Sequence, residues 1–299
     1  MKNNVLSCCK LCPRKCGADR NSGETGFCGA SDKIKIARSD LHFWEEPCIS
    51  GDKGSGTVFF SHCTLKCVYC QNYKISTENK GRFVTESELA HCFLDLQGKG
   101  ALNINLVTPT HYVPQIIEAL KIAKEKGLSL PVLYNTSGYE NPETLELLKG
   151  YVDIFLPDFK YFSNELAKKY SCAEDYPKVA KKAIAKMFEL VGKCQFDENG
   201  IIKKGVIVRH LMLPEQEEDS NKILEYLYRT YGDDIFISIM SQYTPLETLP
   251  KEFPELNKKL DMTVYDKVLD FAVNLGVENA FIQEEEAASE SFIPDFWDD

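Results

Sequence analysis

Between Gly51 and Gln283, short apolar runs alternate with longer stretches in which apolar residues recur at helical spacing. The runs contain few polar residues, which is typical of parallel strands covered on both faces. We predict strands at residues 56–61, 102–108, 131–135, 152–157, 205–213 and 234–240, and a less regular seventh at 279–283.

The helical stretches have recognisable ends. Thr85 and Glu88 have the spacing of a capping box, in which each side chain bonds a free backbone N–H at the start of a helix. Residues 113–127 and 141–150 each end on glycine, which favours helix termination. Residues 176–192 and 220–232 also have apolar residues at helical spacing and end on glycine.

Alternating strands and helices predict an α/β fold with a parallel sheet. Six or seven units fit a curved, incomplete (β/α)6 barrel better than a closed barrel of eight. We expect the barrel at residues 51–283, a small Cys-rich N-terminal extension at 1–50 with a short strand at 33–38, and an acidic C-terminal tail at 284–299. In such folds the functional side chains lie where the parallel strands end.

Composition excludes several classes of protein. The chain has 299 residues and a formal net charge of −10, so a nucleic-acid partner is not expected. No apolar run is long enough to span a membrane, and none at the start forms a leader, so we predict a cytoplasmic protein. That compartment keeps thiols reduced, and the clustered cysteines among the twelve therefore indicate metal binding.

Three cysteines, Cys63, Cys67 and Cys70, follow the first predicted barrel strand. Thiolates at this spacing can hold three corners of an iron–sulfur cluster and leave one iron open. Closed metal sites are usually structural, whereas open ones react. The alternative is a zinc site completed by His62.

The spacing C-x3-C-x2-C, with Tyr69 before the last cysteine, resembles the radical S-adenosylmethionine (SAM) superfamily. Further segments are similar to an uncharacterised branch related to pyruvate formate-lyase-activating enzyme. They are "CKLCPRKCGADRNSGETGFCGA", "EEPCISGDKGSGTVFF", "CVYCQNYKIS", "NLVTPTHYVPQI", "YNTSGYE", "VDIFLPDFKY", "VRHLMLPE" and "IMSQYTP". The resemblance implies a radical SAM barrel, a 4Fe–4S cluster on the three cysteines, and SAM bound to the fourth iron. Reductive cleavage of SAM would then give a radical that abstracts a hydrogen atom.

The same resemblance implies SAM contacts at the ends of the strands. Tyr69 lies beside the cluster. Activating enzymes often carry Gly-Gly-Glu after the second strand, where this chain has Thr108, Pro109 and Thr110, which puts that contact in doubt. Asn135 follows the third strand, and its alternative role is that of a turn residue.

Five further contacts come from the later strands. Asp158 and Lys160 are two residues apart and therefore point to one side, where they bind SAM or form an internal salt bridge. Arg209 interrupts an apolar strand and would hold a carboxylate or form a structural ion pair. Gln242 and Tyr243 end the sixth strand, although tyrosine is also common in protein cores.

A second group of cysteines precedes the barrel. Cys9, Cys12, Cys16 and Cys28 supply four ligands and thus a closed site, in which Cys8 could replace Cys9. The group fits a zinc ion that stabilises the segment, or a second iron–sulfur cluster that passes electrons to the first. A metal-free role is the remaining alternative.

Together these features predict an enzyme that cleaves SAM and activates a glycyl radical enzyme. Its partners would be SAM, that enzyme and a reductant such as flavodoxin or ferredoxin. Radical modification of another peptide, RNA or a small molecule uses the same chemistry. A non-catalytic iron–sulfur electron carrier is the alternative from a different class, but a carrier needs no polar SAM pocket.

Overall fold

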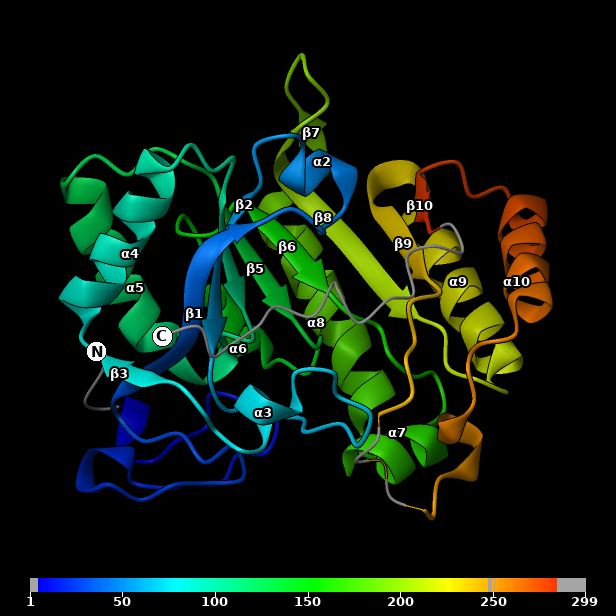
Figure 1. Ribbon diagram of the computed structural model, residues 1–299, viewed down its shortest axis with the longest axis horizontal. Helices are drawn as coiled ribbons and strands as arrows, with labels where there is room; N and C mark the ends of the chain where they lie inside the picture. Colours follow the sequence, from blue (N-terminus) through cyan, green and yellow to red (C-terminus); the bar gives the residue numbers. More distant parts are fainter. Residues whose placement is uncertain (1–4, 247–248, 250, 284–299) are drawn as a thin grey trace.

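The computed structural model describes residues 5–246, 249 and 251–283, which contain one curved sheet with helices packed around it (Figure 1). Seven strands run parallel in the order β2, β4, β5, β6, β8, β9 and β10. Their bounds are Ser55–Phe60, Ile104–Val107, Val132–Thr136, Ile154–Pro157, Ile202–Leu211, Phe236–Met240 and Ala280–Ile282. All seven predicted strands are present, although their bounds shift by up to three residues.

The parallel strands occur in the sheet in chain order, so each crossover moves to the adjacent position. Within the described residues the sheet does not close on itself, because its two ends are β3 (Arg82–Val84) and β10. The predicted α/β class and the incomplete barrel are therefore confirmed, with a Cys-rich segment ahead of the barrel.

The longer helices cover the outer face of the sheet (Figure 1). They are α4 (Glu86–Gly98), α5 (Val113–Glu125), α8 (Tyr176–Val191), α9 (Glu217–Tyr231) and α10 (Met262–Leu275). The predicted capping box of Thr85 and Glu88 is confirmed. Shorter helices are α2 (Pro47–Ser50), α3 (Tyr73–Ser76), α6 (Pro142–Glu146) and α7 (Asn164–Ser171).

One helix prediction needs correction, and two helices were not predicted. Helix α6 ends four residues before Gly150, because Leu147 and Leu148 bond to carbonyls three residues back, the tighter spacing typical of a turn. Helices α7 and α10 have no counterpart in the sequence analysis.

Strand β1 (Ile34–His42) runs antiparallel along the whole of β2, and β3 pairs with β1 in turn. The predicted strand at 33–38 is thus longer and belongs to the barrel sheet. A short strand, β7 (Gln195–Phe196), pairs with β8.

The segment before β1 lies beyond the carboxyl ends of the parallel strands, whereas α2 lies at their opposite ends (Figure 1). Two side chains at the start of α6 hold this segment by its backbone. Asn141 donates to the Lys10 carbonyl at 2.7 Å and Thr144 donates to the Leu11 carbonyl at 2.7 Å.

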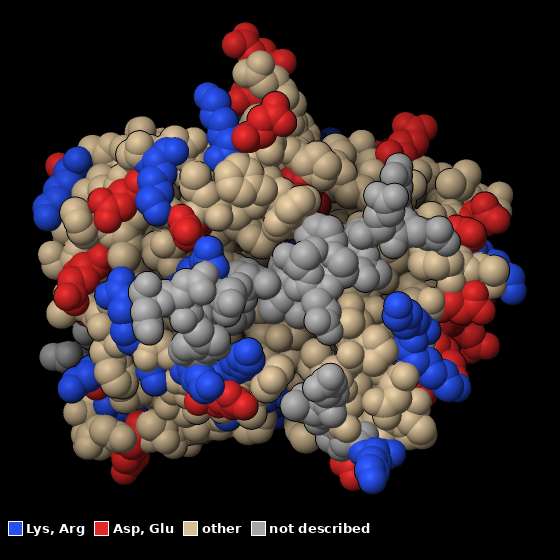
Figure 2. All heavy atoms as spheres, in the orientation of Figure 1, with Lys and Arg blue, Asp and Glu red and all other residues tan. Residues whose placement is uncertain are grey.

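On the part of the visible face that the structure describes, acidic and basic side chains are interspersed, without a continuous basic surface (Figure 2). None of the helices in the described ranges is both long and apolar enough to cross a membrane.

Candidate active site

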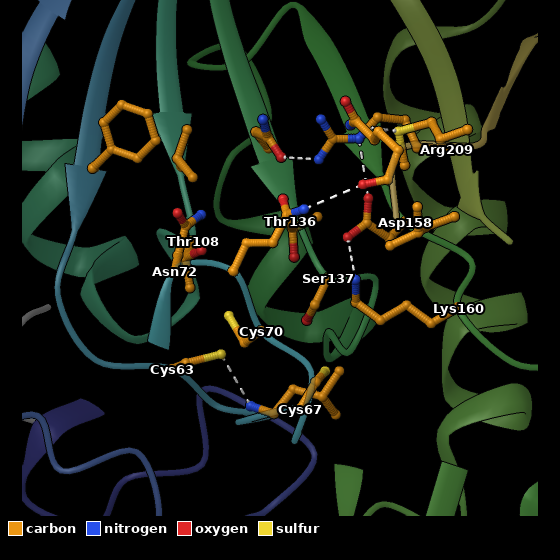
Figure 3. A pocket seen from close by; sticks show the side chains of 18 of the residues that line it. Cys63, Cys67, Cys70, Asn72, Thr108, Thr136, Ser137, Asp158, Lys160 and Arg209 are labelled. Atoms are coloured by element: carbon orange, nitrogen blue, oxygen red, sulfur yellow. Dashed lines mark hydrogen bonds and ion pairs between the residues drawn. The ribbon is translucent and has the colours of Figure 1, made fainter. Parts of the chain in front are cut away.

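A cavity of about 240 Å³ opens at the carboxyl ends of the parallel strands (Figure 3). Its lining includes the three cysteines of the loop after β2 and seven of the eight predicted SAM contacts, namely Tyr69, Thr108, Asn135, Asp158, Lys160, Arg209 and Gln242. The eighth, Tyr243, is not part of the lining. Its buried hydroxyl donates to the Leu256 carbonyl at 2.6 Å, and its ring packs edge-on against Tyr69.

The loop that carries the cysteines has an unusual backbone. His62 has a φ of 77° and Lys66 has a φ of 54°, which are left-handed values that non-glycine residues rarely adopt. Such strain persists only where the surroundings impose it, and it is concentrated at functional sites. The loop therefore turns around the three sulfurs at a conformational cost.

Each of the three sulfurs accepts a hydrogen bond. The backbone N–H groups of Leu65 and Lys66 donate to Cys63 Sγ at 3.3 and 3.5 Å. Hydroxyl groups donate to the other two, from Ser171 to Cys67 Sγ at 3.0 Å and from Ser76 to Cys70 Sγ at 3.5 Å. Donors of this kind are the outer shell expected around thiolate ligands.

Burial raises the pKa of all three thiols, and that of Cys70 to about 12. The thiolate form therefore requires a cation at this position. Three soft sulfur ligands in one loop at the cavity suit three irons of an iron–sulfur cluster.

The zinc alternative required His62 as the fourth ligand. The His62 ring is not in the cavity lining and packs instead among His111, Tyr112 and the backbone at Gly29. Burial lowers its pKa to about 4, with Lys35 acting in the same direction. His62 is thus a neutral core side chain.

A network of charged groups forms the other wall of the cavity (Figure 3). Asp158 accepts from Arg209 Nε at 3.0 Å through one oxygen and from Lys160 Nζ at 2.6 Å through the other. Arg209 also donates to Glu45 Oε2 at 3.2 Å and to Asn135 Oδ1 at 2.6 Å.

The network keeps its members ionised. Burial would raise the pKa of Asp158, but Lys160 and Arg209 together hold it below its usual value. The pKa of Arg209 and that of Lys160 are raised despite burial, chiefly by Asp158. Buried charges are tolerated only when paired in this way.

Glu45 is a site residue that the sequence analysis missed. It lies after β1, lines the cavity, and accepts from Asn105 at 3.0 Å and from Asn135 at 3.2 Å. The expectation that functional groups follow parallel strands does not cover β1, because β1 is antiparallel. The only signal in the sequence is the pair Glu45–Glu46 between a strand and the rest of the barrel.

Thr108 has a φ of 59°, an outlier for a β-branched residue, and its N–H donates to the Asn135 carbonyl at 2.9 Å. The start of the loop after β4 is therefore fixed to the end of β5 at the cavity. Thr136 and Ser137 also line it and were not predicted.

The N-terminal cysteines lie on the cluster-loop side of the barrel. Cys9, Cys12 and Cys28 are buried and Cys16 is exposed. Burial raises the pKa of Cys12 to about 12, and the neighbouring Cys28, Glu140 and Cys9 add to the effect. Glu140 is fully buried and its Oε2 has no hydrogen-bond partner.

These features define an α/β-barrel enzyme with an open three-cysteine site beside a polar pocket. The sequence model of the Radical SAM superfamily matches residues 57–227, which is more than half of the chain, and the protein belongs to this superfamily. The family implies a 4Fe–4S cluster and SAM as co-substrate.

Two proteins of Methanocaldococcus jannaschii are similar in sequence. The uncharacterized protein MJ0674 is 28% identical over 284 residues, which are 90% of this chain and 75% of the relative. The putative glycyl-radical enzyme activating enzyme MJ1227 is 29% identical over 206 residues, which are 68% of this chain and 79% of the relative. The predicted relation to activating enzymes agrees with the second match.

Solved structures share the fold at low identity. A radical SAM methyltransferase from Sphaerobacter thermophilus superposes with a TM-score of 0.52 at 12% identity, covering 77% of this chain and 66% of that chain. The structure of Streptococcus suis SuiB bound to precursor peptide SuiA superposes with a TM-score of 0.50 at 15% identity and covers 74% of this chain. This chain covers 46%, about half, of SuiB.

Proposed function

We propose that the protein binds a 4Fe–4S cluster through Cys63, Cys67 and Cys70 and cleaves SAM in the cavity beside it. The observation that carries the proposal is that the three sulfurs, one buried and two partly buried, each have a hydrogen-bond donor and share one cavity with a paired set of charged side chains. When bound, the cluster supplies the electron that cleaves SAM to methionine and a 5′-deoxyadenosyl radical.

The residues of the chain would bind and orient SAM. Arg209 presents a planar guanidinium suited to a carboxylate, and Asp158 presents acceptors suited to an ammonium or ribose hydroxyl. Lys160 and Asn135 hold these two groups in place through the bonds described above. Tyr69, Thr108 and Gln242 complete the lining, whereas Tyr243 would act only by packing against Tyr69.

Within this chemistry, we propose the activation of a glycyl radical enzyme in the cytoplasm, with flavodoxin or ferredoxin as reductant. The similarity to MJ1227 supports it. The sheet is open between its ends, and Trp44, which is 62% exposed, lies at the cavity lining. A polypeptide loop could enter there. SuiB, whose structure contains a precursor peptide, makes peptide modification the second candidate.

At the N-terminal cysteines we propose a second iron–sulfur cluster rather than zinc. Four cysteines, Cys9, Cys12, Cys16 and Cys28, come from one short segment ahead of the barrel. Cys28 affects the pKa of Cys63, so the two groups lie near each other. An electron could pass between them.

The first test is SAM cleavage by anaerobically reconstituted protein reduced with dithionite. We expect 5′-deoxyadenosine and methionine from the wild type and none from Cys67→Ala. A wild type that holds its cluster but never cleaves SAM would contradict the proposal. Appearance of a glycyl radical signal on a co-incubated glycyl radical enzyme would support activation.

Metal analysis of the triple variant Cys63→Ala, Cys67→Ala, Cys70→Ala separates the two N-terminal alternatives. Iron that stays with this variant indicates a second cluster, whereas zinc indicates a structural ion.

A further inference from the structure

The hydroxyl of Ser171 is the nearest of the donors that contact the three cysteine sulfurs. Ser171 ends helix α7, is 1% exposed, and places Oγ 3.0 Å from Cys67 Sγ. The donors to Cys63 and Cys70 lie at 3.3 to 3.5 Å. Ser171 and Cys67 are 104 positions apart in the chain, so their contact exists only in the folded protein.

Ser171 is held in register with the cysteine loop by the backbone. The N–H of Val68 donates to the Tyr170 carbonyl at 2.9 Å. Arg14 donates to the Ser171 carbonyl at 3.0 Å and to the Thr64 carbonyl at 3.1 Å. The end of α7 and the loop therefore form one rigid unit, and the Ser171 hydroxyl cannot easily leave Cys67.

A buried tyrosine competes for the hydrogen of that hydroxyl. Tyr161 is fully buried; its hydroxyl donates to the Tyr69 hydroxyl at 2.7 Å and lies 2.8 Å from Ser171 Oγ. A tyrosine and a serine hydroxyl each have one hydrogen. Tyr161 is therefore an acceptor toward Ser171, and the Ser171 hydrogen is shared between Tyr161 and Cys67 Sγ.

We propose that Ser171 is a positioning residue that sets the reduction potential of the cluster through its hydrogen bond to Cys67. The inference rests on the proposed role of Cys67 as a cluster ligand. Hydrogen bonds to cluster sulfurs are among the factors that tune the potential. Reduction adds negative charge to the cluster and its thiolates, and a donor stabilises that charge. Ser171 therefore makes the one-electron reduction easier.

The test measures the midpoint potential of the cluster without SAM. Reconstituted wild type, Ser171→Ala and Tyr161→Phe are titrated anaerobically, and the electron paramagnetic resonance signal of the reduced cluster is followed against potential. We expect a more negative midpoint in Ser171→Ala and a less negative one in Tyr161→Phe, because the second change leaves Cys67 as the acceptor of the Ser171 hydrogen. The matched control is Ser220→Ala, since Ser220, on helix α9, is also 1% exposed but bonds His210 on strand β8.

Wild-type midpoints in both variants, at normal iron content, would overturn the proposal. If Ser171→Ala does not load iron, Tyr161→Phe decides, because that variant keeps the serine. A wild type that binds no cluster would refute the proposed function instead, so the two failures are distinguishable.

Discussion

His210 is buried next to Arg209 but points to the other side of strand β8, because successive residues of a strand alternate. Its Nδ1 lies 2.8 Å from the Phe159 carbonyl and its Nε2 lies 2.8 Å from the Ser220 hydroxyl. A carbonyl only accepts, so Nδ1 carries the hydrogen and Nε2 accepts. Burial lowers the pKa of His210 to about 4, with Lys160 lowering it further and Asp158 opposing.

This pKa predicts a pH-dependent stability. An unfolded histidine has a pKa of about 6.5, so between pH 6.5 and 4 the unfolded chain binds more protons at this residue. The contribution of His210 to the free energy of unfolding is fully present above pH 6.5 and is lost as the pH falls, by about 3 kcal/mol at most. We expect the free energy of unfolding of His210→Gln, measured with urea from pH 4 to 7, to change less with pH than that of the wild type. The same change with pH in both proteins would contradict the assignment of His210 as a neutral side chain.

At the scale of the elements, one glycine allows two loops of the site to approach each other closely. Gly138 follows β5 with a φ of 76°, and a Cβ there would lie 2.3 Å from the Asp158 carbonyl oxygen. The Tyr176 hydroxyl bridges the same two loops, with contacts to the carbonyls of Ser137 and Asp158. The position of Asp158 in the cavity thus depends on this close approach.

We expect Gly138→Ala to destabilise the protein by about 3–5 kcal/mol, from left-handed backbone strain plus displacement of the Asp158 backbone. Gly150→Ala is the matched control, because Gly150 has a φ of 78° with no atom within 4 Å of an added Cβ. It should cost only the strain, about 1–2 kcal/mol. Urea unfolding measures both, and equal losses would show that the contact with Asp158 does not matter.

At the scale of the whole molecule, the N-terminal segment is packed onto the barrel through buried arginine contacts. Arg20 is 1% exposed and donates to the His111 carbonyl at 2.7 Å and, through Nε, to the Ser31 carbonyl at 3.1 Å. His111 itself is buried, and its Nε2 lies 2.8 Å from the Ser61 carbonyl next to the cluster loop. The two cysteine groups therefore share one structural support.

Arg20→Ala should loosen this segment, because it leaves buried carbonyls without donors at about 1–3 kcal/mol each. We expect faster amide hydrogen exchange across residues 5–31 and little change in β5 and β6. Arg229→Ala is the control, since the Arg229–Glu225 pair is a surface contact within one helix. Unchanged exchange in Arg20→Ala would mean that other contacts hold the segment.

Local patterns were sufficient for much of this architecture. Near-continuous apolar runs predict parallel strands wherever they occur, and Thr85 with Glu88 caps a helix through contacts three residues apart. The polar set Asn135, Asp158, Lys160 and Arg209 could be expected in one cavity because parallel strands end at the same edge. The end of α6 and the extent of β1 depend on packing and pairing and were not evident.

The sequence by itself determined the class of fold, the superfamily and the loop that carries Cys63, Cys67 and Cys70, since each depends on residues close together in the chain. Only the tertiary structure decided which groups surround them. Glu45 reaches Arg209 across 164 positions, and Ser171 reaches Cys67 across 104. The tertiary structure also directs the Tyr243 hydroxyl to the Leu256 carbonyl and out of the cavity. Such contacts depend on strand order, register and side-chain direction, which no local pattern encodes.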